Sequence, residues 1–330
     1  MDLSVVIPTH DRPLLLRDAI QSVASQRGPD REIVIVDDAS NSPVDVLRLQ
    51  SDFGLAIRAV RNEHSRNVCV ARDQGVQASR GEVILHLDDD DCLADGALEM
   101  AWDAVRRDSS LEVLFLGVRG FGPKAIPFND IQERGVRRLL SNSGGEAIEE
   151  GLIKFGDHLF PALLAGVPMA FQRVMVRRKA WDKVTNFRRR IYAEPGLDAG
   201  ADPILRVPPL WNESEWALYA SVLCTTALLD RPLYLQRCAG QGYFSVAYRE
   251  SETVNIGINM MNRLGHATRT TTEFAPWIRL VREYRGRAHV NRAYRCLRQG
   301  DRIGAMKSML RALSIAPRWT YSRFLAKFVA

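Results

Sequence analysis

The stretch Ile84-Leu85-His86-Leu87-Asp88-Asp89-Asp90-Asp91 (residues 84–91) sets four consecutive carboxylates directly after a short apolar run. Four adjacent like charges repel one another and burial raises their pKa values, so the cluster is costly without a cation. Carboxylate oxygens suit Mg²⁺ or Mn²⁺. A solvated acidic loop is the competing interpretation. The position favours a ligand site, because open α/β sheets bind ligands at the carboxyl ends of their strands.

The residues before this stretch alternate between apolar runs and helical patterns. Runs of strand type occupy residues 3–7, 32–36, 57–60 and 83–87. After the first run, Asp11 is expected to cap a helix that has Pro13 in its first turn. The alternation predicts an α/β fold with a mostly parallel, doubly wound sheet.

A second acidic pair, Asp37-Asp38, follows the second predicted strand. Parallel strands end at one edge of a sheet, so both acidic ends can converge on one ligand. The sequence contains neither GxGxxG nor GxxxxGK[ST], and a diphosphate held here would need a metal to neutralise its charge. Asp38 can accept hydrogen bonds from a base or a ribose. The alternative for the pair is an Asx cap at a strand-to-turn junction.

Four segments closely resemble the family 2 glycosyltransferases: SVVIPTHDRP (4–13), IVDDAS (35–40), residues 67–81 and LDDDD (87–91). The resemblance is strongest in the N-terminal third, and it implies a GT-A fold, a DxD motif and inversion at the anomeric carbon. His10 stands where the family usually has tyrosine, and Cys69 where glycine is common. By position, the resemblance implies a metal site at Asp90 and Asp88, and donor contacts from Pro8, Thr9, His10, Asp38, Arg72, Asp88 and Asp89.

The middle of the chain is expected to select the acceptor. Residues 174–179 (VMVRRK) resemble the strand and helix under the family's acceptor site, and residues 195–209 contain too many Pro and Gly residues for regular structure. That loop is predicted to close over the donor. In NESEWAL (212–218), the family's catalytic base matches Glu215, with Glu213 in reserve; a base must take the proton of the acceptor hydroxyl. The alternative is helix N-terminal charge matched to the macrodipole.

The C-terminal region is strongly basic. The segment from Trp277 onward contains thirteen basic and two acidic residues, so its net charge is +11. The whole chain has a net charge of +6, so the residues before Trp277 carry −5. This charge suits an anionic membrane surface or a lipid-linked diphosphate, and a solvated basic surface is equally compatible with it. No nucleic-acid-binding motif accompanies it, so no nucleic acid is expected. The spacing of one tetratricopeptide-like helical hairpin is met by Ala293, Gly300, Ala305, Met309, Ala312 and Pro317.

Three regions are expected: a nucleotide-sugar-binding half of the GT-A domain (1–115), an acceptor-binding half (116–250) and a basic helical region (251–330). Five scattered cysteines without CxxC spacing indicate a reducing compartment and argue against a zinc site. No signal peptide and no bilayer-length apolar run is recognised. We therefore expect a cytoplasmic protein, in contact with the inner face of the membrane through its basic helices.

These observations together predict a metal-dependent, inverting glycosyltransferase. It would move a sugar from a UDP, dTDP or GDP donor to a hydroxyl of a glycan or lipid-linked acceptor in bacterial envelope polysaccharide or lipopolysaccharide synthesis. A non-catalytic nucleotide-sugar binder or scaffold of the same fold is the alternative. An aspartyl phosphohydrolase also places paired Asp at a strand end, but residues 88–92 lack the Thr or Val that it needs after its nucleophile.

Overall fold

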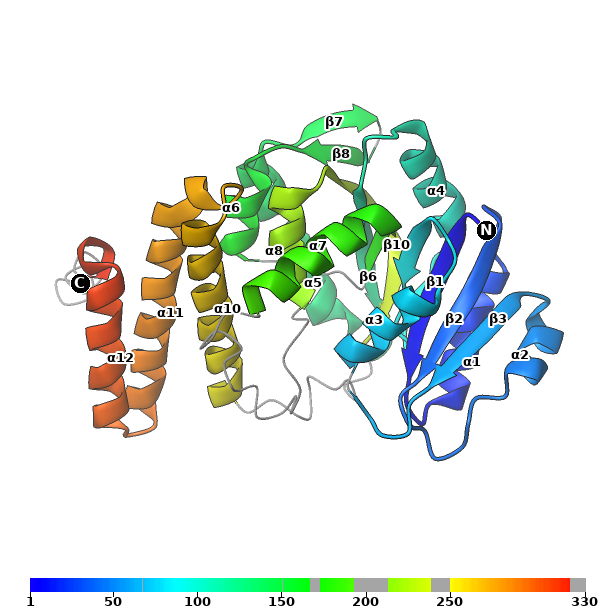
Figure 1. The fold of residues 1–330 in the computed structure, drawn as a ribbon, viewed down its shortest axis with the longest axis horizontal. Coiled ribbons are helices and arrows are strands. Elements are labelled where there is room, and N and C mark those ends of the chain that lie inside the picture. The colour runs from blue at the N-terminus through cyan, green and yellow to red at the C-terminus, as the bar shows by residue number, and fades with distance from the viewer. Residues whose placement is uncertain (67, 150, 167–172, 193–212, 239–249, 321–330) are drawn as a thin grey trace. The chain divides into compact units, whose positions relative to one another are not determined.

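The computed structural model describes residues 1–66, 68–149, 151–166, 173–192, 213–238 and 250–320 (Figure 1). Its contacts divide the chain into two compact units. The first contains residues 1–188 and 209–241, and the second contains residues 189–208 and 242–330. The predicted breaker-rich loop, residues 195–209, lies outside the described residues.

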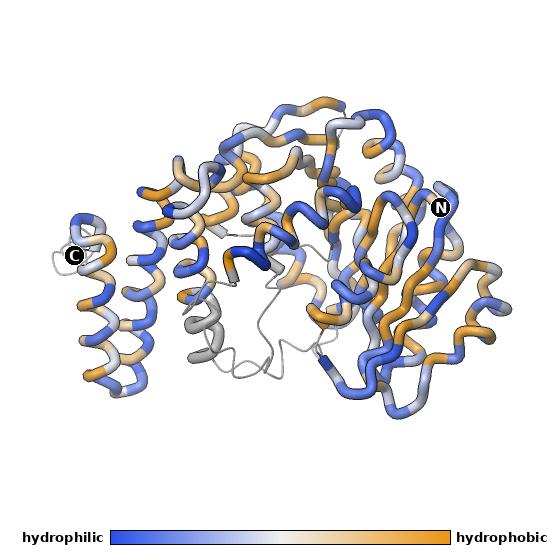
Figure 2. Tube along the Cα trace, in the orientation of Figure 1, coloured by the Kyte–Doolittle hydropathy of each residue, from blue (hydrophilic) through white to orange (hydrophobic). Residues whose placement is uncertain are grey.

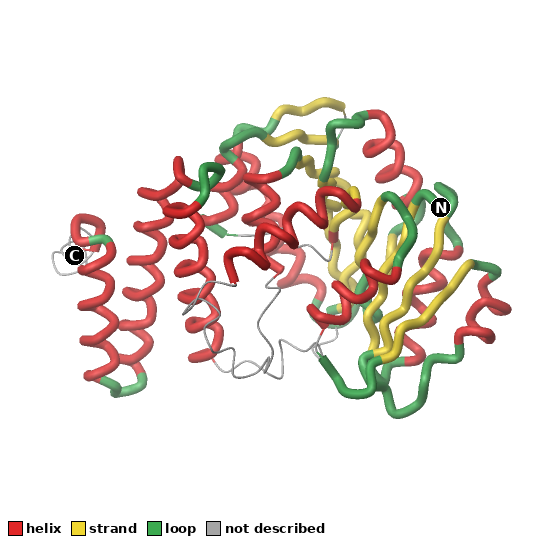
Figure 3. The backbone as a smooth tube through the Cα atoms, viewed as in Figure 1, coloured by secondary structure: helices red, strands yellow, loops and turns green. Residues whose placement is uncertain are grey.

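The first four strands form the parallel part of the sheet in the order β3-β2-β1-β4 (Figure 3). Figure 2 shows how apolar these central strands are, and β1 is buried along its whole length. This is the doubly wound pattern predicted from the alternating runs. The elements are β1 (Leu3–Thr9), α1 (Pro13–Ala24), β2 (Arg31–Asp37), α2 (Val46–Phe53), β3 (Ala56–Arg61), α3 (Val68–Ala78) and β4 (Val83–His86).

Beyond β4 the sheet becomes mixed. Strand β9 (Val174–Arg177) pairs antiparallel with both β4 and β6 (Val113–Phe121), and β10 (Thr226–Arg237) runs parallel to β6. The two predicted halves therefore share one ten-stranded sheet. The remaining elements of the unit are β5 (Cys92–Leu93), α4 (Ala97–Arg107), α5 (Ala125–Ser143), β7 (Glu146–Glu149), β8 (Leu152–Phe155), α6 (Leu159–Leu164), α7 (Arg178–Tyr192) and α8 (Glu213–Leu223).

Helix α3 lies unusually close to the sheet. A Cβ atom on Gly75 would come within 2.3 Å of Val6 Cγ1, so only glycine allows this approach. The helix contacts β1, β2 and β3. Arg72, one turn before Gly75, is only 2% exposed as a result. Close packing of α3 thus fixes a charged side chain near the strand ends.

Helix α1 begins after Arg12, and Pro13 stands in its first turn as predicted. The expected cap by Asp11 is wrong, because no side chain caps this helix. Asp11 adopts a left-handed backbone with φ of 53°, which turns its carboxylate towards the loop after β2. There it accepts hydrogen bonds from the main-chain N and the Nδ2 of Asn41, both at 2.7 Å.

The second unit is helical in its described part. Helix α11 (Ile278–Arg298) packs against both α10 (Glu250–Thr270) and α12 (Arg302–Ile315), and a 3₁₀ turn (Ala275–Trp277) precedes it. Gly300 turns the chain with φ of 80°, and Asp301 caps α12 by accepting from the Gly304 N–H at 2.8 Å. The likeness of α11 and α12 to a tetratricopeptide repeat stays a prediction. Among the described residues, no helix is long and apolar enough to cross a membrane.

Candidate functional site

The candidate site lies where β1, β2 and β4 end at one edge of the sheet. His10 Nδ1 lies 2.8 Å from the Asp38 carbonyl oxygen, and the Asp38 N–H donates to the Thr9 carbonyl oxygen at 2.9 Å. Ala39, like Asp11, is a non-glycine residue in the left-handed region, with φ of 67°. Such backbone is uncommon and gathers at functional sites. The loops after β1 and β2 therefore hold each other in a specific conformation.

The two carboxylates after β2 have different surroundings. Burial raises the pKa of Asp37, but hydrogen bonds from Ser40 and Arg61 outweigh it and hold the pKa below its usual value. Asp37 accepts from the Ser40 N–H at 2.8 Å and from Arg61 Nη1 at 2.6 Å, and the Val44 N–H adds a longer contact. Asp37 therefore matches the Asx-type alternative, in which the carboxylate stabilises the turn.

Asp38 is held by the loop after β3. Its carboxylate accepts from Asn62 Nδ2 at 2.7 Å, from Ser65 Oγ at 2.8 Å and from the Arg66 N–H at 2.9 Å. The residue is 5% exposed. This fixed orientation is suited to reading hydrogen-bond donors of a base or ribose, because little side-chain entropy remains to be lost on binding.

The acidic run after β4 separates into two kinds of position. Carboxylate oxygens of Asp88, Asp90 and Asp91 all lie within 4.8 Å of one another. Asp89 turns away, accepting from Thr9 Oγ1 at 2.7 Å and from Arg12 Nη1 at 3.1 Å. The expected metal ligands Asp88 and Asp90 are thus brought together, and Asp91 joins them.

Asp91 was missing from the predicted set, although the four-carboxylate run contains it. Strand β10 holds Asp91 in place, because Tyr234 Oη donates to its carboxylate at 2.9 Å and the Arg237 N–H donates at 2.8 Å. The Arg237 guanidinium donates to the Asp90 carbonyl oxygen at 2.9 Å. These partners lie far away in the sequence, so only the run itself could have signalled Asp91.

The cluster carries more negative charge than its surroundings balance. Burial, followed by repulsion from Asp88 and Asp90, raises the pKa of Asp91 to about 8. Burial raises the pKa of Asp89 to about 6, and burial with the neighbouring Asp88 also raises that of Asp90. Three convergent, crowded oxygen donors are the ligand set that a hard divalent cation prefers. The residues present therefore fit a bound Mg²⁺ or Mn²⁺.

Two arginines reduce the repulsion from different sides. Arg72, almost fully buried, donates to Asp88. Arg12, whose side chain is 36% exposed, donates to both Asp89 and Asp90, at 3.1 and 3.0 Å. Arg12 was not among the predicted site residues, because only the turn after β1 brings it to the end of β4.

The other expected donor contacts lie at the same edge. Pro8 and Thr9 are the buried last residues of β1. The next side chain, His10, is 53% exposed. An exposed imidazole beside the Asp38 carbonyl is available to stack on a base. The donor role of each of these residues stays a prediction.

The candidate base lies on α8. Glu215 is fully buried and accepts a hydrogen bond from Tyr219 Oη at 3.0 Å. The next residue, Trp216, packs on Trp181 with 5.6 Å between ring centroids, and Trp181 packs on His86 at 4.6 Å. This aromatic row connects α8 to β4, which precedes the acidic run. The side chain of the reserve candidate, Glu213, lies outside the described residues.

The comparisons agree with this geometry. Residues 4–147 match the sequence profile of Glycosyl transferase family 2. The chain is 34% identical over 131 residues to the poly(ribitol-phosphate) beta-N-acetylglucosaminyltransferase TarP of Staphylococcus aureus (38% of this chain, 40% of TarP). It is 35% identical over 98 residues to the GalNAc(5)-diNAcBac-PP-undecaprenol beta-1,3-glucosyltransferase of Campylobacter jejuni (29% and 32%). The chain thus spans only 32–40% of the length of such relatives.

Solved structures show the same fold over a longer range. S. aureus TarS 1–349 in complex with UDP-GlcNAc superposes with a TM-score of 0.57 at 14% identity, covering 94% of this chain and 90% of that one. The mannosyltransferase PcManGT from Pyrobaculum calidifontis, in complex with GDP-Man and Mn²⁺, gives 0.52 at 16% identity (99% and 79%). The chain carries a family 2 glycosyltransferase domain and has the GT-A fold with additional C-terminal helices.

Proposed function

We propose that this protein is an inverting glycosyltransferase, which moves a sugar from a nucleotide-diphosphate sugar to a hydroxyl of a glycan or glycolipid. The observation that carries the proposal is the shared sheet edge, where the fixed Asp38 carboxylate follows β2 and the three convergent carboxylates follow β4, on either side of β1. The first group suits the nucleoside and the second suits the diphosphate. Relatives named as glycosyltransferases support the reaction class.

In this proposal the donor lies along the edge from β2 to β4. Asp38 accepts hydrogen bonds from the base or ribose, and His10 stacks beside it. Pro8 and Thr9 form the floor under the nucleoside. Thr9 also holds Asp89 away from the cluster, so that Asp89 supports the donor loop.

Asp90 and Asp88 would hold the divalent cation, and the structure adds Asp91 as a third candidate. When bound, such a cation neutralises charge that develops on the departing diphosphate. Arg72 donates to Asp88 and so orients its carboxylate. The solved complex of PcManGT with GDP-Man and Mn²⁺ supports a metal of this kind.

Glu215 is proposed as the base that takes the proton of the acceptor hydroxyl, with Glu213 in reserve. The hydrogen bond from Tyr219 orients the carboxylate. Attack from the side opposite the diphosphate would invert the anomeric carbon.

The acceptor is proposed to belong to bacterial envelope glycan or glycolipid synthesis. Relatives named for poly(ribitol-phosphate) and for an undecaprenol diphosphate support this class of acceptor. The synthesis would take place in the cytoplasm, at the inner face of the cell membrane. The basic C-terminal helices would contribute an electrostatic contact with that surface.

The first test is calorimetric titration of the full chain with UDP, GDP and dTDP, each with and without Mn²⁺. We expect one nucleotide to bind much more tightly with the metal, and Asp90→Ala to abolish that difference. Asp130→Ala, which removes an exposed carboxylate of α5 outside the cluster, serves as the matched control. If folded protein binds none of the three, the donor site and the transferase proposal fail together.

Substitution of Glu215 separates an enzyme from a nucleotide-sugar binder. Glu215→Gln keeps the shape and should bind the donor as the wild type does, while transfer falls by a factor of about 10²–10⁴. The measurement is single-turnover transfer at saturating donor, beside calorimetric donor binding. Full transfer by this variant would disprove the base assignment, and Glu213→Gln would then be examined.

A further inference from the structure

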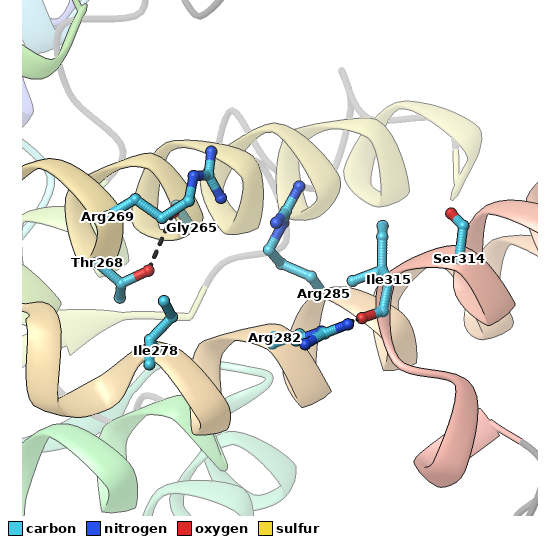
Figure 4. A pocket seen from close by; sticks show the side chains of 8 residues that line it. All are labelled: Gly265, Thr268, Arg269, Ile278, Arg282, Arg285, Ser314 and Ile315. Atoms are coloured by element: carbon cyan, nitrogen blue, oxygen red, sulfur yellow. Dashed lines mark hydrogen bonds between the residues drawn. The ribbon is translucent and has the colours of Figure 1, made fainter.

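Three arginines line one cavity of the helical unit. Arg269 on α10 and Arg282 and Arg285 on α11 surround a volume of about 320 Å³ (Figure 4). One water molecule needs only roughly 10–15 Å³ of such space, so the cavity can hold a polyatomic ligand. The rest of its wall is formed by Gly265, Thr268, Ile278, Ser314 and Ile315.

No carboxylate balances this charge in the part of the chain that the structure describes, because no ion pair there involves any of the three arginines. Arg285 donates to Asn262 Oδ1, with Nη2 at 3.2 Å and Nε at 3.4 Å, and Arg282 donates to the Ile315 carbonyl oxygen. Both acceptors are neutral. Burial, and then repulsion from Arg269 and Arg282, lowers the pKa of Arg285. The cavity therefore concentrates positive charge.

A glycine makes room for the central guanidinium. A Cβ atom on Gly265 would lie 2.7 Å from Arg285 Cδ and 2.9 Å from its Nε. Glycine is a poor residue inside a helix, and Gly265 is part of the last turns of α10. Its place here allows the Arg285 side chain to lie directly against that helix, as Figure 4 shows.

We propose that this cavity is a binding site for the phosphate or diphosphate group of an anionic ester. A guanidinium presents several N–H donors in a planar fork that matches phosphate oxygens, and Arg269 and Arg285 extend into the same space. The hydroxyls of Thr268 and Ser314 each donate their one hydrogen to a carbonyl of their own helix, and rotation of either O–H would redirect it to a bound phosphate oxygen. Ile278 and Ile315 suit the organic part of an ester.

This site is separate from the acidic edge of the sheet, and the proposal does not depend on sugar transfer. All its residues belong to the helical unit. A nucleotide held by the acidic cluster would require a divalent cation, whereas the arginine cavity would bind its anion without one. The difference makes the two sites distinguishable in one experiment.

The test is calorimetric titration of the full chain with inorganic pyrophosphate in EDTA. We expect one site, weakened about tenfold or more by Arg285→Gln and by Arg269→Gln, since each removes a charged donor. Arg298→Gln, which removes the same charge from an exposed position of α11 outside the cavity, should leave affinity unchanged. An equal loss in Arg298→Gln, or no binding by the wild type, would overturn the proposal.

Two further variants guard against a loss caused by misfolding. Arg269 is exposed, so its substitution should leave thermal unfolding unchanged. Gly265→Ala retains every arginine but places a methyl group against Arg285, and it should also weaken pyrophosphate binding. Tight binding by folded Gly265→Ala together with folded Arg285→Gln would contradict the assigned cavity.

Two further experiments distinguish a lipid headgroup from a soluble ester as the source of the phosphate group. Sedimentation with vesicles containing phosphatidic acid, lost in the Arg269→Gln/Arg285→Gln double variant but kept in Arg298→Gln, would support a lipid headgroup. Titration with glycerol 3-phosphate, lost in the same double variant, would support a soluble ester. A third outcome is that the double variant keeps vesicle binding while the wild type fails to bind pyrophosphate. That result would show that the region is only a general basic surface, and it would overturn the proposal.

Discussion

The molecule has two charged regions of opposite sign that differ in how their charge is balanced. At the sheet edge, the acidic run is held by Arg12 and Arg72. In the helical unit, the cavity arginines contact only neutral acceptors among the described residues. Because its charge is partly balanced, the acidic cluster can persist without a cation and still bind one. The cavity arginines have no such balance within the described part of the chain, so their positive charge remains available to a bound anion. The comparison predicts different responses to substitution and to pH.

The largest expected effect is on the acidic side. Arg72→Gln should lower the free energy of unfolding by about 3 kcal/mol in EDTA, because it leaves the partly buried Asp88 charge without its partner. Arg12→Gln should cost at most about 1 kcal/mol, because the Arg12 side chain is one-third exposed and its ion pairs are screened. Urea unfolding of both variants measures the difference. Equal costs would mean that burial does not set the strength of these pairs.

The metal-free acidic cluster should make the first unit less stable as pH rises. The pKa of Asp91 is about 8 in the folded protein and near 3.8 when unfolded, so between these values the folded state alone holds the proton. The free energy of unfolding therefore falls with pH across this window, by up to about 1.4 kcal/mol per unit for one group. The fall per pH unit should be steepest below pH 6, where Asp89 also holds a proton in the folded state only, and Asp91 should sustain it between about pH 6 and 8.

Asp91→Asn provides the check on this effect. In EDTA the variant should lose most of the slope between pH 6 and 8 and should be more stable than wild type at pH 8. Mn²⁺ should stabilise the wild type most at high pH, because cation binding requires ionised carboxylates. A flat stability profile for metal-free wild type would show that the cluster is better solvated than its burial indicates.

The sequence predicted what local patterns determine. The strands β1 to β4 follow from apolar runs, and so do the positions of Asp38 and Asp88 after β2 and β4, whose donor roles stay predictions from the family resemblance. It predicted a strand within residues 174–179 but not its place between β4 and β6, because a sheet order depends on pairing between distant segments. Asp91 was missed for the same reason, since Tyr234 and Arg237 of β10 position it.

The arginine cavity of the helical unit was also not predicted from the sequence. The excess of arginine was evident from composition, but composition gives a net charge and no cavity. Whether three arginines converge depends on which faces of α10 and α11 meet, and on the room that Gly265 leaves for Arg285. A glycine inside a helical pattern was the available signal for such a close approach.

The smallest expected effect is the opposite pH response of the basic unit. His289 on α11 is buried, and burial followed by repulsion from Arg311 and Arg292 lowers its pKa to about 4. Between about pH 6.5 and 4 the unfolded chain takes up a proton that the folded chain does not, so stability falls as pH decreases. His289→Leu should remove part of this loss, by about 1 kcal/mol at pH 5, and exposed His64→Asn should not.

Amide hydrogen exchange in α11 measures this change in stability. Equal amide exchange rates in wild type and His289→Leu at pH 5 would mean that α11 opens enough to hydrate the imidazole. Arg285 lies on the same helix, so the arginine cavity would then be less rigid than a phosphate site requires.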